Sequence, residues 1–100
     1  MKILLVCGGG ASSSFVAQNV KKASIKNNID AEIEAIGETE LEDYIEGNDI
    51  VLFGPHLKYL EENLKETCDY YNVPYRFISE EHYAKMDGEA ILNNVLEIIK

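Results

Sequence analysis

The segment Ile3-Leu4-Leu5-Val6, followed by Cys7-Gly8-Gly9-Gly10-Ala11-Ser12-Ser13-Ser14, is the part of the chain around which the rest is interpreted. Apolar residues in an unbroken run are typical of a buried strand, and the small residues after them are typical of a loop. Apolar residues then recur at helical spacing, at Phe15, Val16, Val20 and Ala23. The segment predicts a strand, a tight turn and a helix, with Cys7 where the strand ends.

This turn has the properties of an anion-binding loop. Glycines let the backbone bring its N–H groups close to a ligand, and a helix N-terminus offers unpaired donors and partial positive charge. The predicted phosphoryl-binding loop consists of Gly8, Gly9, Gly10, Ala11, Ser12, Ser13 and Ser14. The helix end would stabilise a thiolate by roughly 0.3–1 kcal/mol, or up to about 2 kcal/mol when partly buried. At about 1.36 kcal/mol per pKa unit, this would lower the pKa of Cys7 by roughly one unit. We therefore expect Cys7 to be a nucleophile that can carry a phosphoryl group.

Composition limits the classes of function. The chain has 100 residues, which predicts one domain over residues 1–100, and its formal net charge is −9. An acidic chain is a poor match for nucleic acid or for an anionic membrane surface. The apolar runs are too short to span a bilayer, and Met1-Lys2 leads directly into a strand without a signal-peptide pattern. We expect a cytoplasmic protein with no nucleic-acid partner, no cofactor and no metal site.

The remaining sequence predicts a regular alternation of strands and helices. Strands are expected at 3–6, 31–36, 50–53 and 75–78, and helices at 12–27, 39–45, 55–72 and 87–99. Ser12 is a plausible N-cap of the first helix, Thr39 and Glu42 form a capping-box pattern, and Pro55 suits the first position of a helix. Ser79 is expected to cap a short turn that runs through His82 and Tyr83.

This alternation indicates an α/β fold: a single-domain, flavodoxin-like, three-layer architecture with helices on both faces of a four-stranded parallel sheet. The natural strand order is 2-1-3-4. In such sheets ligands bind beyond the carboxyl ends of the strands, where the strand order reverses. Here those ends are residues 7–14 and 54–58, so the pattern places Cys7 at the predicted site.

Other reactive side chains have less distinctive surroundings. Cys68 lies on an apolar helix face with Leu57, Leu60 and Leu64, so we expect it in the core. His56 follows Gly54-Pro55 at the predicted site edge, where a partner contact and an ordinary polar surface role are both open. His82 is expected at a cap or on the surface. Cys7 itself has a plain alternative, since a cysteine at a strand end is often only a small buried residue.

Several Cys-loop and phosphate-loop classes lack residues that they require. A tyrosine-phosphatase loop needs an arginine where this chain has Ser13, and the only arginine is Arg76. Without a guanidinium to clamp the transition state, ester hydrolysis is poorly supported. A response-regulator receiver would need acidic residues at the strand ends, where Cys7-Gly8 and Gly54 stand. A thioredoxin-like site lacks its second cysteine, and neither a dinucleotide fingerprint nor a Walker A loop is present.

The chain resembles a known family, the lactose/cellobiose (chitobiose) class of enzyme IIB components of the sugar phosphotransferase system. The loop from Cys7 to Ser14 matches the family pattern C-x-x-G-x-S-[ST]-S. Two further matches are Val51-Leu52-Phe53-Gly54-Pro55-His56 and Tyr83-Ala84-Lys85-Met86-Asp87-Gly88. Together, in this order, they extend the resemblance over essentially the whole chain.

The resemblance implies a phosphocarrier. By similarity, Cys7 accepts a phosphoryl group from a phosphohistidine on the IIA protein and passes it to a β-disaccharide presented by the membrane permease IIC. The missing arginine then agrees with a relay that must not hydrolyse its phosphocysteine. Possible partner contacts are Pro55, His56 and Lys58. A low-molecular-weight phosphatase or arsenate-reductase-like enzyme, and a non-catalytic anion-binding module, are the alternatives.

Overall fold

Strand β1 (Lys2–Cys7) occupies an inner position in a four-stranded parallel sheet. The computed structural model describes residues 1–7 and 12–99, apart from the side chains of residues 12 and 13. β1 pairs with β2 (Glu32–Gly37) on one side and with β3 (Ile50–Phe53) on the other, and β4 (Tyr75–Phe77) adds to β3. The order β2-β1-β3-β4 confirms the predicted topology.

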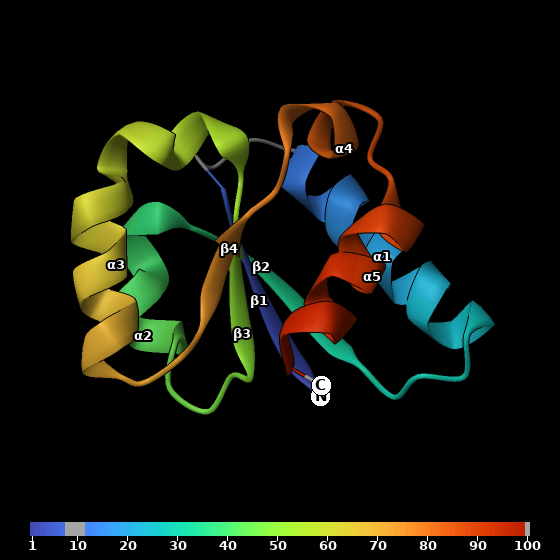
Figure 1. Ribbon diagram of the computed structural model, residues 1–100, viewed down its shortest axis with the longest axis horizontal. Coiled ribbons are helices and arrows are strands. Elements are labelled where there is room, and N and C mark those ends of the chain that lie inside the picture. Colours follow the sequence, from blue (N-terminus) through green and yellow to red (C-terminus); the bar gives the residue numbers. More distant parts are fainter. Residues whose placement is uncertain (8–11, 100) are drawn as a thin grey trace.

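Helices cover both faces of this sheet (Figure 1). α1 (Ser12–Lys26), α4 (Glu80–Ala84) and α5 (Gly88–Ile99) lie on one side. The other side carries α2 (Leu41–Tyr44) and α3 (Glu61–Tyr70), with the 3-10 helices η1 (Glu38–Glu40) and η2 (Pro55–Leu60) leading into them. The result is the expected three-layer, doubly wound arrangement.

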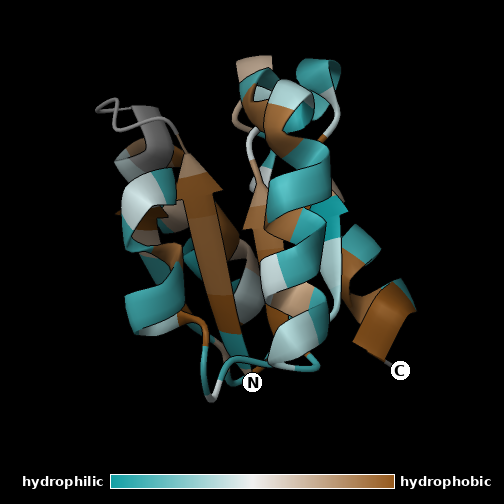
Figure 2. Cartoon of the chain, turned by 90° about the vertical axis from the view of Figure 1, so that its left-hand side faces the viewer, coloured by the Kyte–Doolittle hydropathy of each residue, from teal (hydrophilic) through white to brown (hydrophobic). Residues whose placement is uncertain are grey.

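The alternation of side chains along β1 divides the core into two halves. Ile3, Leu5 and Cys7 belong to the cluster beneath α1 and α5, whereas Leu4 and Val6 belong to the cluster beneath α2 and α3. β3 is buried throughout, as expected of an inner parallel strand. Figure 2 shows inner strands that are mostly hydrophobic, whereas hydrophilic and hydrophobic residues alternate along the helix in front of them. The thiol of Cys7 therefore points to the α1–α5 side.

One local expectation proves wrong. Thr39 and Glu42 form no capping box, because the chain enters α2 through η1; Gly37 and Glu40 hold the cap positions, without a side-chain cap hydrogen bond. Phe15 is 54% exposed, because the buried face of α1 is set by Val16, Val20 and Ala23. Other local signals are confirmed: Pro55 opens η2, and the Ser79 hydroxyl accepts from the His82 backbone N–H at 3.1 Å.

Helix α5 begins in direct contact with the backbone of α1. A Cβ atom at Gly88 would lie 2.2 Å from the carbonyl oxygen of Asn19 and 2.8 Å from the nitrogen of Val20. Both are backbone atoms of a helix and cannot swing aside. Residue 88 must therefore be glycine for the two helices to pack as they do.

We predict that Gly88→Ala lowers the free energy of unfolding by about 1–3 kcal/mol, because the added methyl overpacks the α1–α5 contact. Urea unfolding followed by circular dichroism measures the change. Gly37→Ala is the matched control: a Cβ there meets its nearest atom at 3.8 Å, so we expect a change within about 0.5 kcal/mol. Equal stability of the two variants would contradict the packing account.

Candidate functional site

The sheet geometry places Cys7 at the carboxyl end of an inner strand. Cys7 stands opposite Gly37 of β2, and the backbone N–H of Gly54, just after β3, donates to the Val6 carbonyl at 2.9 Å. Residues 7 and 54, which follow the strand ends predicted to form the site, thus lie side by side where the strand order reverses. The side chain of Cys7 is buried, with 1% of its surface exposed.

A tyrosine that the sequence did not mark as a site residue contacts the thiol. The hydroxyl of Tyr83, from α4, donates to the sulfur of Cys7 at 3.4 Å. The two residues are far apart in the sequence, and no local pattern signals their contact. The only hint was that Tyr83 begins the third stretch on which the resemblance to the IIB family rests.

His56 packs on the same tyrosine from the opposite helical layer. The ring centroids of His56 and Tyr83 are 5.6 Å apart. A Cβ atom at Gly54 would lie 2.5 Å from the Cε1 of His56, so the absent side chain at Gly54 gives the imidazole its place. η2 and α4 thus meet above the sheet edge where Cys7 lies.

The predicted phosphoryl-binding loop is described only in part. Gly8, Gly9, Gly10 and Ala11 lie outside the described residues, and Ser12, Ser13 and Ser14 begin α1. Ser14 is exposed. The first turn of α1 carries no acidic residue, whereas the first turns of α2, α3, α4 and α5 each carry one or two. The helix that follows Cys7 therefore keeps its partial positive charge uncompensated.

Burial raises the pKa of the Cys7 thiol, because desolvation disfavours the thiolate. The hydrogen bonds from the Tyr83 hydroxyl and the Gly54 backbone act in the opposite direction, without overcoming burial. The expected lowering of this pKa is therefore wrong. The sequence-based estimate considered the helix end and omitted the cost of burying a thiolate at the end of an inner strand.

The other predicted residues lie farther along the same edge or in the core. Pro55 is partly buried at the start of η2; Lys58 pairs with Glu61 at 3.1 Å and lies 4.6 Å from the centre of the Phe77 ring. Cys68 is buried on the inner face of α3, as predicted, and burial raises its pKa to about 11. This cysteine is a core residue.

The single arginine is not placed to clamp an anion at Cys7. Arg76 is exposed on the edge strand β4, in register with Leu52 of β3. β4 is two strands from β1, or about 10 Å at the usual strand spacing. Within residues 1–7 and 12–99, no group of three His, Cys, Asp or Glu side chains is arranged to hold a metal ion. The helices in this part of the chain are also too short or too polar to cross a membrane.

Comparison with known protein families assigns the chain to one of them. The family model described as the lactose/cellobiose-specific IIB subunit of the phosphotransferase system matches residues 2–94. The chain belongs to this family. As a IIB protein it is a phosphotransferase component of a sugar phosphotransferase system.

Individual relatives support the same assignment. The chain is 30% identical to an oligo-beta-mannoside-specific EIIB component of Bacillus subtilis, over 98% of this chain and 95% of that protein. It is 26% identical to a galactose-specific EIIB component of Lactococcus lactis, over 90% and 88% of the two chains. The solution structure of a cellobiose-specific IIB protein from Borrelia burgdorferi matches with a TM-score of 0.80 and 36% identity, over 97% and 89%.

A further solved structure shows how well the fold is preserved at low identity. The lactose-specific IIB domain from Streptococcus pneumoniae has a TM-score of 0.87 at 15% identity, over 97% of this chain and 95% of that one. At this identity the likeness concerns the fold alone.

We predict that Tyr83→Phe raises the pKa of the Cys7 thiol, because the hydroxyl that stabilises the thiolate is lost. A hydrogen bond of ordinary strength implies a roughly three- to tenfold slower alkylation of Cys7 below its pKa. The pH dependence of iodoacetamide labelling, read at the Cys7 peptide by mass spectrometry, measures it. Tyr59→Phe is the control, because Tyr59 is 79% exposed. An unchanged pH midpoint in Tyr83→Phe would show that the contact has no electrostatic effect.

Proposed function

We propose that Cys7 is the phosphocarrier residue of this IIB protein. It takes a phosphoryl group from a phosphohistidine of the IIA protein and gives it to a β-linked disaccharide held by the membrane permease IIC. The observation that carries the proposal is the position of the thiol, at the carboxyl end of an inner parallel strand and beneath the Tyr83 hydroxyl. The protein would work in the cytoplasm and, during sugar transfer, at the inner face of the membrane.

The first transfer forms one bond and breaks another at phosphorus. The Cys7 sulfur attacks the phosphorus atom of the phosphohistidine, the S–P bond forms and the N–P bond breaks. The proton of the thiol neutralises the released imidazole. In the second transfer a sugar hydroxyl attacks the same phosphorus, the S–P bond breaks, and the hydroxyl proton returns to the thiolate. No co-reactant besides phosphorylated IIA and the sugar is required.

The surroundings of Cys7 suit the charge that such a carrier must hold. A phosphoryl group on sulfur brings negative charge to a chain that already has a net charge of −9. The first turn of α1 carries no carboxylate, so its N–H groups and partial positive charge can favour the anion. Residues 8–14 are proposed to supply these donors to the phosphoryl group.

The position of Arg76 favours a relay over a hydrolase. A guanidinium clamp stabilises the transition state for attack by water, and the one arginine of this chain lies on the outer strand β4. Backbone donors can hold the phosphoryl group without such a clamp. The phosphocysteine is therefore expected to wait for its acceptor.

The relatives suggest the class of sugar. Similar proteins carry the names oligo-beta-mannoside-, galactose- and cellobiose-specific. We propose a β-disaccharide of the cellobiose, chitobiose or lactose class as substrate, with its identity selected mainly in the IIC pocket. Pro55, His56 and Lys58, which follow β3 at the same edge as Cys7, are proposed to contact a partner.

We predict that phosphorylated IIA transfers label to the wild-type protein and to Cys68→Ala, and that Cys7→Ser loses this transfer. Cys68 is the matched control because it is the second cysteine and lies in the core. Transfer of radiolabelled phosphate and mass spectrometry of the Cys7 peptide provide the measurement. Wild-type labelling of a folded Cys7→Ser variant would refute the assignment.

A further inference from the structure

The segment that carries Tyr83 ends in an unusual backbone conformation. At the end of α4 the N–H of Asp87 donates to the His82 carbonyl at 2.9 Å, and the N–H of Met86 donates to the Tyr83 carbonyl at 3.1 Å. These two bonds form a Schellman motif, whose left-handed position is usually a glycine. Here that position is Met86, with φ +50°. A residue other than glycine is strained in this left-handed backbone conformation, so the surrounding contacts must hold Met86 there.

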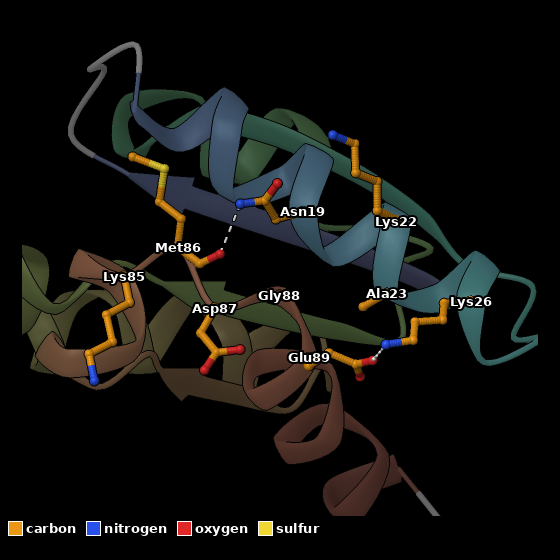
Figure 3. Close-up of a pocket in the computed structure, with 9 residues that line it drawn as sticks. All are labelled: Asn19, Lys22, Ala23, Lys26, Lys85, Met86, Asp87, Gly88 and Glu89. Carbon is orange, nitrogen blue, oxygen red and sulfur yellow. Dashed lines mark hydrogen bonds and ion pairs between the residues drawn. The ribbon is translucent and has the colours of Figure 1, made fainter.

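One such contact comes from α1. The side-chain amide of Asn19 donates to the carbonyl oxygen of Met86 at 2.9 Å, and both residues are partly buried (Figure 3). The two groups face each other across the groove between α1 and residues 85–89, a hollow of about 400 Å³. Asn19 thus fixes the strained residue that directly follows the turn carrying Tyr83.

The same segment is fixed at its other end. Gly88 touches the backbone of Asn19 and Val20, and a carboxylate oxygen of Asp87 accepts from the Ala90 N–H at 3.1 Å, which caps α5. We call Asn19, Met86 and Gly88 the brace. It ties the end of α4 to the middle of α1, and Tyr83 lies one helical turn before it.

The brace and the thiol contact share the same short piece of chain. Tyr83 donates to Cys7 from its side chain, and its backbone carbonyl accepts from Met86. A shift of Met86 away from α1 would therefore move the Tyr83 ring relative to the sulfur. Among residues 1–7 and 12–99, His56 is a further titratable group at this contact, because its ring packs on the Tyr83 ring.

We propose that Asn19 is a positioning residue for the chemistry of Cys7: by holding the Met86 carbonyl, it keeps the Tyr83 hydroxyl within reach of the sulfur. The importance of Asn19 for phosphoryl transfer rests on the proposed function. The geometric link from Asn19 through Met86 to Tyr83 does not depend on it. The inference also gives a physical role to the stretch from Tyr83 to Gly88, one of the stretches on which the family resemblance rests. One end of it contacts the thiol and the other holds the segment against α1.

A double-mutant cycle tests the link, because a residue that acts only through Tyr83 has no effect once the hydroxyl is gone. The proteins are wild type, Asn19→Ala, Tyr83→Phe and the double variant. The main measurement is the pH at which iodoacetamide labelling of the Cys7 peptide is half-maximal. We expect Asn19→Ala to raise this midpoint by about half a unit, or roughly threefold less thiolate at lower pH. In the Tyr83→Phe background we expect no further rise.

Asn27→Ala is the matched control for a structural effect. Asn27 is also an asparagine of the α1–α5 contact, and its amide donates to the Ala23 carbonyl at 2.7 Å and to Glu89 at 3.2 Å, without touching Met86. We expect this variant to leave the midpoint unchanged, even if urea unfolding shows a similar loss of stability. If Asn19→Ala does not fold, Asn19→Leu keeps the side-chain size, removes the donor without adding a charge and takes its place in the cycle.

Two results would overturn the inference: an unchanged midpoint in the folded Asn19 variant, or an equal rise in the presence and absence of the Tyr83 hydroxyl. A second measurement, the rate of labelling by phosphorylated IIA, separates this inference from the proposed function. If wild-type Cys7 accepts no phosphoryl group, the proposed function fails, while the alkylation cycle still decides whether Asn19 positions Tyr83.

Discussion

The parallel pairing of β1 with strands on both sides is the constraint on which the rest of the structure depends. Because β2 and β3 hold the last residues of β1 in register, Cys7 has little freedom at the sheet edge. The alternation along β1 then sends its thiol toward α1, α4 and α5, whereas Val6 enters the opposite half of the core. Strand pairing thus selects which helices can reach the sulfur, and α4 supplies Tyr83.

The same constraint creates a conflict between burial and reactivity. A thiol held at the end of an inner strand is desolvated, and desolvation raises its pKa. A hydroxyl and a backbone N–H partly offset this effect, and the helix that follows leaves its N-terminal turn free of carboxylates. A group that is hard to ionise in isolation suits a carrier whose partner brings both the phosphoryl group and an acceptor for the proton.

Much of this arrangement follows from sequence patterns, because they report on local periodicity. The unbroken apolar run at 50–53 indicates an inner strand and the alternation at 31–36 an edge strand, and both agree with 2-1-3-4, the natural order for four alternating strands. The contact between Tyr83 and Cys7 could not be derived in this way, since it depends on how α4 docks, and that depends on Gly88 and Asn19. The pKa of Cys7 was misjudged for a related reason: burial is a property of the packed sheet. The predicted capping box failed because η1 changes where the helix starts.

The most direct test of a relay is the fate of the phosphoryl group once it is on Cys7. Phosphorylated protein, freed of IIA, is followed for release of inorganic phosphate, and unphosphorylated IIA is then added. For a relay without an arginine clamp, we expect the phosphorylated protein to release inorganic phosphate slowly when it is alone. After IIA is added, we expect the label to return rapidly to IIA. Rapid release of phosphate at a rate that IIA does not change would contradict the account and indicate a hydrolase.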